Sequence, residues 1–160
     1  MLLALIIAAT LQGPGDVESL TASSDAVVHG RVVRQTSAWA PGGGQIFTTV
    51  VLRRMEAWKG SPAAEIAVIV PGGEVGDLAQ IVQGAATFRE GEEVVVFLRR
   101  REHSAYGVER MALGKFSVQG SPARAFRERR GVTCLRCTPA ESDDLPLDEL
   151  RARVRGSARK

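Results

Sequence analysis

The stretch that decides the fold is residues 92–99, which read EEVVVFLR. Its five central residues are apolar, three of them are valines, and charged residues stand on both sides. A run of this length is typical of a strand that is apolar on both faces, because valine favours extended backbone and a buried helix would need more residues. The stretch therefore predicts a strand of the hydrophobic core.

Three more strands are predicted upstream of this run. From Ala26 the apolar residues recur with a period of two, and residues 45–58 and 65–70 are also β-branched runs bounded by glycine- and proline-rich turns. Within 45–58 the apolar phase slips at Met55, across two arginines. A slip of this kind is what a β-bulge produces, and bulges bend strands at the corners of barrels.

The remaining segments complete a mainly β fold. Residues 106–109 and 113–118 predict one further strand or a bent pair, which makes five or six strands in an antiparallel, OB-like barrel. Asp16 predicts the N-cap of a short N-terminal helix. A C-terminal helix is predicted from an apolar stripe at helical spacing, formed by Leu147, Leu150 and Val154.

The chain divides by composition into three parts. Residues 1–15 begin with an apolar run that is too short to cross a membrane and has the length of a signal-peptide core. We expect this leader to direct export to the periplasm or the medium, with no membrane span left in the mature chain. The alternative is a buried first strand or helix of a cytoplasmic domain. Residues 16–120 form the predicted barrel, and residues 121–160 form an arginine-rich tail.

The net charge of +3 and the pI of about 9.3 come from that tail. Residues 1–120 hold 11 basic and 12 acidic groups, whereas residues 121–160 hold 10 basic and 6 acidic groups. A nucleic-acid-binding OB-fold combines a positive groove with stacking aromatic residues. The predicted barrel is not basic, so the high pI does not indicate nucleic-acid binding.

Two cysteines, Cys134 and Cys137, form a CxxC motif in the tail. A local disulfide in an oxidising compartment is the favoured interpretation. A free thiol pair or redox chemistry stays open, although Thr138-Pro139 follows the motif instead of an immediate helix. A zinc site would need two further ligands at a suitable spacing, and the sequence shows none.

A glycine-rich loop follows the strand at 65–70 and includes the binding-loop candidates Gly72, Gly73, Glu74, Gly76 and Asp77. The order of strand, glycine-rich loop and possible helix at 77–82 can cradle phosphate. The two acidic residues would repel an anion, and no lysine follows the glycines. We therefore expect a recognition loop, because loops on a rigid barrel commonly carry binding.

The loop that begins at Trp39 is the second part of this candidate surface, extending to Gly44. No catalytic pattern accompanies it. His29 lies on a predicted strand and His103 in a charged loop, and neither belongs to a Ser/His/Asp or Cys/His arrangement. We expect no enzyme activity, no metal and no cofactor.

Several of these segments together resemble a known kind of domain. They are residues 24–33 (SDAVVHGRVV), the triplet Trp58-Lys59-Gly60, Phe88, and residues 90–98. Their order resembles small exported bacterial β-barrel proteins, and also the OB-fold inhibitory domain of tissue inhibitors of metalloproteinases and the netrin module. The resemblance covers about residues 16–118 and implies a closed five-stranded barrel with helices outside it. It does not extend to the inhibitory mechanism, which needs an N-terminal cysteine.

The sequence thus predicts an exported, non-enzymatic binding module of the protein-binding or inhibitor-like kind, whose partner is another protein. An OB-type nucleic-acid-binding protein is the first alternative. A thiol-redox protein that uses Cys134 and Cys137 is the second.

Overall fold

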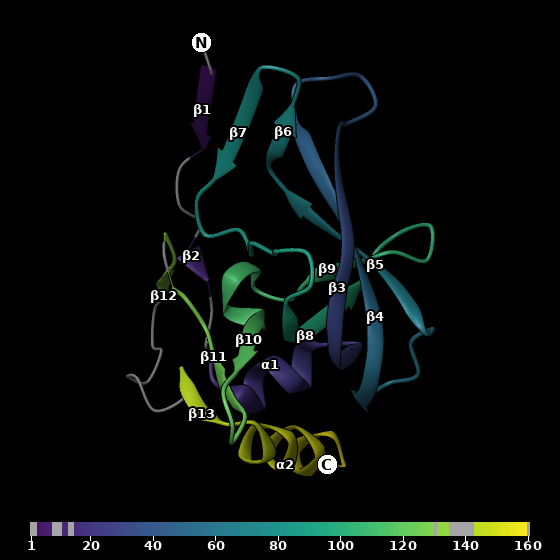
Figure 1. Cartoon of the computed structure of the whole chain (residues 1–160), viewed down its shortest axis with the longest axis vertical. Coiled ribbons are helices and arrows are strands. Elements are labelled where there is room, and N and C mark those ends of the chain that lie inside the picture. The colour runs from purple at the N-terminus through teal and green to yellow at the C-terminus, as the bar shows by residue number, and fades with distance from the viewer. Residues whose placement is uncertain (1–2, 8–10, 13–14, 130, 135–142, 160) are drawn as a thin grey trace.

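The computed structural model describes residues 3–7, 11–12, 15–129, 131–134 and 143–159. Strands make up 49% of the chain and helices 17%, so the fold is mainly β, as predicted. A closed barrel forms the centre of the molecule, two helices lie beneath it, and a hairpin rises above it (Figure 1).

The barrel is closed by five strands. In chain order these are β3 (Ala26–Trp39), β4 (Ile46–Lys59), β5 (Glu65–Pro71), β8 (Glu93–Arg100) and β9 (Tyr106–Val108). Around the barrel the order is β3-β4-β5-β9-β8, and β8 pairs back onto β3. The pairings are antiparallel except for the one that closes the barrel, where Val68 of β5 pairs in parallel with Tyr106 of β9. The predicted OB-like barrel is confirmed.

Strand β8 separates two hydrophobic cores, which explains why its sequence is apolar on both faces. Val94, Val96 and Leu98 point into the barrel core. Val95 and Phe97 alternate with them and belong to a second core outside the barrel. All five side chains are fully buried, so one strand anchors both layers.

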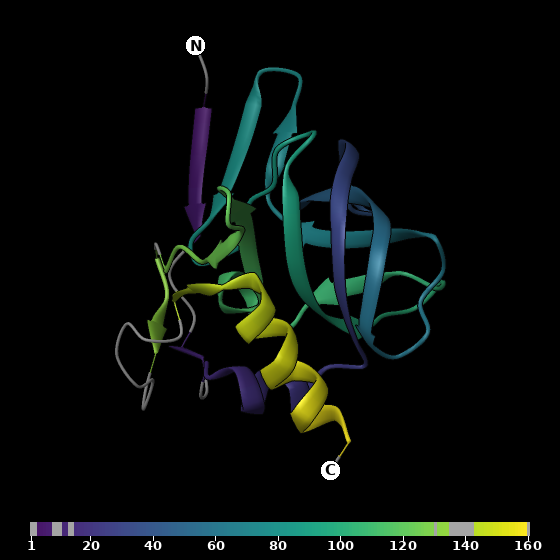
Figure 2. The same cartoon turned by 60° about the horizontal axis from the view of Figure 1, so that its bottom comes forward.

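The second core is covered by the helices α1 (Val17–Ser23) and α2 (Leu147–Ala158), which lie side by side in Figures 1 and 2. The Asp16 carboxylate accepts a hydrogen bond from the Ser19 N–H at 2.8 Å and caps α1, as predicted. The predicted apolar stripe of α2 is buried in this core, and it consists of Leu147, Leu150 and Val154.

The predicted bulge lies at Met55. The register of β3 and β4 shifts between His29, which pairs with Glu56, and Gly30, which pairs with Arg54. Met55 is therefore left without an opposite residue and is 54% exposed. The extra residue bends the long strand where the barrel must curve.

Three short strands extend the sheet outward from β8, and the 3₁₀-helix η1 (Met111–Gly114) comes just before the first of them. The strands are β10 (Lys115–Gln119), β11 (Arg124–Phe126) and β13 (Asp144–Pro146). The sheet continues from β8 through β10 and β11 to β13. The arginine-rich tail thus supplies two strands of the main sheet as well as α2.

A separate three-stranded sheet stands at the other end of the molecule. Its strands are β1 (Leu3–Ile7), β6 (Gly73–Val75) and β7 (Leu78–Val82), in the order β1-β7-β6. The strands β2 (Leu11–Gln12) and β12 (Thr133–Cys134) pair with one another. The interpretation of residues 77–82 as a possible helix was wrong, because residues 78–82 form the strand β7. Pairing with β6 and β1 stabilises extended backbone there, whereas so short a helix is marginal without a packing partner of its own.

Within the described residues, neither helix has the length and apolar character needed to span a bilayer.

Candidate functional site

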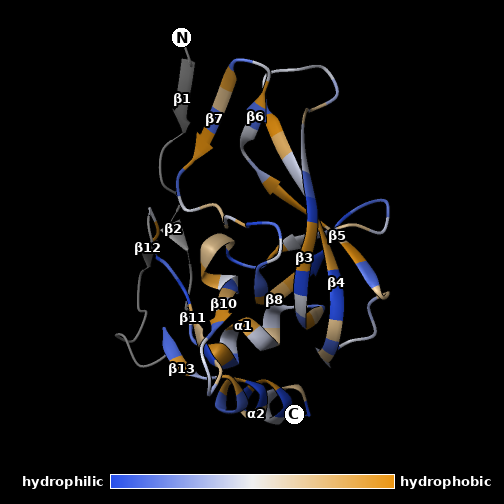
Figure 3. Ribbon diagram, viewed as in Figure 1, coloured by the Kyte–Doolittle hydropathy of each residue, from blue (hydrophilic) through white to orange (hydrophobic). Residues whose placement is uncertain are grey.

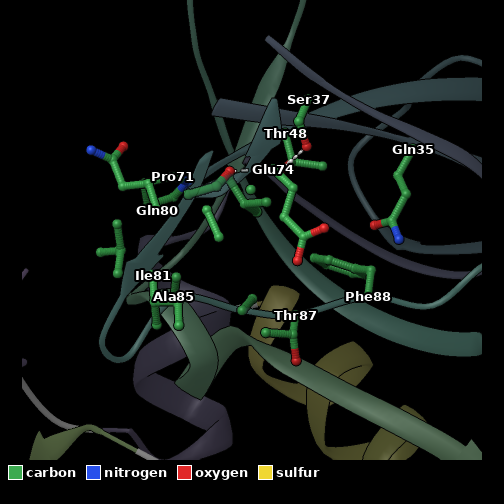
Figure 4. Close-up of a pocket in the computed structure, with 16 residues that line it drawn as sticks. Gln35, Ser37, Thr48, Pro71, Glu74, Gln80, Ile81, Ala85, Thr87 and Phe88 are labelled. Carbon is green, nitrogen blue, oxygen red and sulfur yellow. Dashed lines mark hydrogen bonds between the residues drawn. The ribbon is translucent and has the colours of Figure 1, made fainter. Parts of the chain in front are cut away.

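A hollow of about 540 Å³ lies between the β6–β7 hairpin, the upper ends of β3 and β4, and residues 85–88 (Figure 4). The floor is largely apolar, and Phe88 and Ala86 at that floor belong to the barrel core. Polar side chains stand around it, namely those of Gln35, Ser37, Thr48, Glu74 and Thr87. An apolar floor with a few polar groups around it is the usual character of a ligand site.

The hairpin that roofs the hollow is held down by polar contacts. The Thr48 hydroxyl donates to the Gly72 carbonyl at 2.8 Å and lies 2.8 Å from the Ser37 hydroxyl. On β7, the buried Gln80 accepts a hydrogen bond from the Ile46 N–H at 2.7 Å. These contacts attach the hairpin to the barrel at the residue that precedes β6 and at β7.

Two glycines permit this close approach. Gly72 has a φ of +93°, and a Cβ there would lie 2.8 Å from the Gln80 carbonyl oxygen. Gly73 has a φ of +137°, and a Cβ there would collide with the hydroxyls of Ser37 and Thr48. Only glycine fits both the conformation and the space, so these two binding-loop candidates position the hairpin.

A second hollow, of about 390 Å³, adjoins the first. Both are lined by Ile81, Val82, Ala85, Ala86 and Thr87. The second hollow is more polar, because Arg89, Glu92, Lys115 and Ser117 contribute to its wall. The two hollows therefore share one wall, and Thr87 is an exposed residue that lines both.

Glu92, Lys115 and Ser117 form a compact cluster in this wall. The Lys115 ammonium donates to the Glu92 carboxylate at 2.6 Å and to the Ser117 hydroxyl at 2.9 Å. The Ser117 hydroxyl donates to the same carboxylate oxygen at 2.6 Å. Burial acts to raise the pKa of Glu92, but the hydrogen bonds from Lys115 and Ser117 outweigh it and the pKa lies below its usual value.

This cluster combines a hydroxyl with an amine, as some nucleophilic sites do. Here the Lys115 ammonium is already bound to the Glu92 carboxylate at 2.6 Å, so it is not placed to take up the hydroxyl proton. The hydroxyl already donates to Glu92, whose lowered pKa makes it a weak base. The arrangement supports a structural link between β8 and β10.

The other binding-loop candidates lie around the first hollow. Glu74 points toward it beside Phe88 in Figure 4. Gly76 and Asp77 form the exposed turn of the β6–β7 hairpin. Trp39 ends β3 opposite Ile46 and is 43% exposed. The structure thus brings the two predicted loops to the same end of the barrel, although Trp39 is not part of the hollow's lining.

The CxxC motif falls largely outside the described residues. The backbone of Cys134 lies in β12, which pairs with β2, whereas Cys137 lies outside the described residues. The disulfide and the redox alternative therefore stay predictions.

His29 has a structural environment that the sequence did not show. It is 6% exposed, its Nε2 lies 2.7 Å from the Glu93 carboxylate, and its ring lies 5.8 Å from that of Trp58. Arg31 donates to the same carboxylate at 3.1 Å. The register in which β3 pairs with β8 sets this contact, and that register cannot be read from a single sequence.

Several of the described arginines of the tail are engaged in internal ion pairs. Arg153 makes a two-pronged contact with Glu18 of α1, at 2.8 Å for both nitrogens. Arg151 and Arg155 of α2 both bind Glu56. Arg127, whose side chain is 1% exposed, binds Asp143. Much of the tail's positive charge is therefore directed inward, to carboxylates of the same chain.

Within the part of the chain that the structure describes, no three His, Cys, Asp or Glu side chains gather as a metal site would require. No protein-family model matches the sequence, and no curated protein matches it significantly.

Proposed function

We propose that this chain is an exported, non-enzymatic module that binds another protein in the hollow beneath the β6–β7 hairpin. The observation that carries the proposal is the hollow itself, a depression of about 540 Å³ with an apolar floor at the end of a closed barrel. Concave sites with an apolar lining and a few polar groups are the ones that proteins use for ligands.

The rigidity of the surroundings supports this proposal. The hollow's floor is continuous with the barrel core through Ala86 and Phe88. Its roof is held by hydrogen bonds from Thr48 and to Gln80. A site that is already formed loses little conformational entropy on binding, so more of the contact energy is available for affinity.

The two alternatives have less support. A nucleic-acid site would present free basic side chains beside aromatic ones, whereas Arg151, Arg153 and Arg155 are bound to carboxylates. A redox role depends on Cys134 and Cys137, and Cys137 lies outside the described residues.

Site-specific photo-cross-linking tests the proposal. A photoreactive residue is placed at Thr87, at Glu74, or at Glu102, each in the full chain. Glu102 is an exposed residue beyond the end of β8, at the opposite end of the barrel, and serves as the matched control. The cells that express the protein are irradiated, and cross-linked partners are identified by mass spectrometry.

We expect the same partner protein to be captured from Thr87 and from Glu74, and not from Glu102. Capture in the periplasmic or extracellular fraction would support export as well. Equal capture from Glu102, or capture of nucleic acid in place of protein, would overturn the proposal.

A further inference from the structure

The outer edge of β7 pairs with a segment that lies outside the barrel. β7 pairs with β6 along one edge, and the opposite edge takes Leu3–Ile7 as a parallel strand. Figures 1 and 2 show β1 beside β7, apart from the barrel. An edge strand with unpaired N–H and C=O groups is a template for another chain, so such an edge is either covered or used.

The segment on this edge resembles β7 itself. β1 reads LALII and β7 reads LAQIV, and the register places Leu3 beside Leu78, Ala4 beside Ala79 and Ile6 beside Ile81. Three of the five pairs therefore join identical residues. Parallel, in-register pairing is the arrangement that aligns like residues of two segments.

β7 also presents apolar surface. Leu78 is 39% exposed and Ile81 is 52% exposed, two of the large hydrophobic side chains that the described structure leaves open to solvent. Figure 3 shows most of β7 in orange at this margin of the molecule. Since Ile81 and Val82 also line both hollows, a strand on β7 lies directly beside the proposed binding site.

The strand pairing that keeps β1 in place is local. Within the described strands, β1 pairs with β7 and with no strand of the barrel. Its removal would break one strand pairing and leave both hydrophobic cores in place, because the described core residues begin at Val17.

We infer that the outer edge of β7 is an acceptor site for a short, apolar, extended peptide. Leu3–Ile7 occupies this site as an internal ligand, and a partner's segment of similar sequence binds there in its place. This inference rests on the proposed function and specifies the chemistry of the partner. If the leader is removed on export, as the sequence predicts, the acceptor edge becomes free in the compartment where the partner is met.

The test uses the full chain with β1 disabled in place. The double variant Leu5→Pro/Ile6→Pro removes two consecutive N–H groups, so at least one of them faces β7. Leu5→Val/Ile6→Val is the matched control, because it keeps both N–H groups and the β-propensity. Hydrogen exchange is followed by mass spectrometry over residues 76–83, with β8 as a measure of the intact barrel.

We expect the proline variant to exchange at least tenfold faster over 76–83, with β8 unchanged, and the valine variant to match the native chain. The probe is a synthetic LALII peptide flanked by lysines. It should restore protection and bind the proline variant at least tenfold more tightly than the unsubstituted full chain, whose own β1 competes for the edge. A LAPPI peptide with the same flanks, which lacks both of these N–H groups, should not bind.

The inference is overturned if β7 exchange is the same in all three proteins, or if the peptide binds none of them. It is also overturned if the native chain forms a dimer through its N-terminal segments, since the occupant would then be a second copy. Cross-linking from Thr87 that persists while the peptide fails to bind would reject this inference and leave the proposed function standing.

Discussion

At the scale of single residues, the cluster of Glu92, Lys115 and Ser117 is the most informative polar feature. Glu92→Gln should lower the free energy of unfolding by about 1–3 kcal/mol at pH 7, because Lys115 loses its counter-charge in a half-buried place. Urea unfolding measures this change. Glu65→Gln is the control, since its contact with Arg53 is exposed and 3.7 Å long, and the expected change is below about 0.5 kcal/mol.

The same cluster gives a pH dependence with a definite sign. The pKa of Glu92 is lower in the folded protein than its usual value. Its contribution to stability is therefore present above the unfolded-state pKa and is lost as the pH falls through the folded-state pKa. The stability gap between the native chain and Glu92→Gln should narrow when urea unfolding is repeated below about pH 4.3. A gap that widens on acidification would contradict this account.

Gly73 is the residue on which the hairpin's position depends. Gly73→Ala should destabilise the protein by about 2–4 kcal/mol, because its φ is +137° and the new Cβ would collide with Ser37 and Thr48. Gly43→Ala is the matched control. Its φ is +78°, but open space surrounds it, so only about 1 kcal/mol of backbone strain is expected. Equal thermal shifts for the two variants would refute the close contact.

At the scale of elements, α2 is held by its buried stripe more than by its charges. Leu150→Ala should cost about 2–5 kcal/mol, since Leu150 is fully buried in the second core. Leu78→Ala makes the same change at a position that is 39% exposed, and it should cost less than about 1 kcal/mol. Chemical unfolding compares the two directly, and a Leu78→Ala variant as unstable as Leu150→Ala would show that β7 is a core strand.

Elements with a regular sequence period could be predicted, and those fixed by distant contacts could not. The valines of β8, the slip at Met55 and the α2 stripe are local signals that map directly onto structure. The hairpin at 73–82 was missed because its strands are short and depend on pairing with each other and with β1. Of the site, the sequence indicated the glycine-rich loop, whereas Gln35, Thr87 and Phe88 join it only through the closure of the barrel.

At the scale of the whole molecule, the predicted export and disulfide are tested together. The native protein, isolated from the medium or periplasm, should begin near residue 16 and should gain the mass of two hydrogens on reduction, if Cys134 and Cys137 are bonded. Intact mass spectrometry with and without reductant measures both. A chain that keeps Met1 and shows no change on reduction would contradict both predictions.

A partner that binds in the hollow must lose affinity when the hollow is filled. Thr87→Trp places a large side chain in both hollows from an exposed position. Ser61→Trp does the same in a hollow at the opposite end of the barrel. Affinity for the cross-linked partner should fall at least tenfold, about 1.4 kcal/mol, in Thr87→Trp and stay unchanged in Ser61→Trp. Equal affinity of both variants and the native chain would contradict the account.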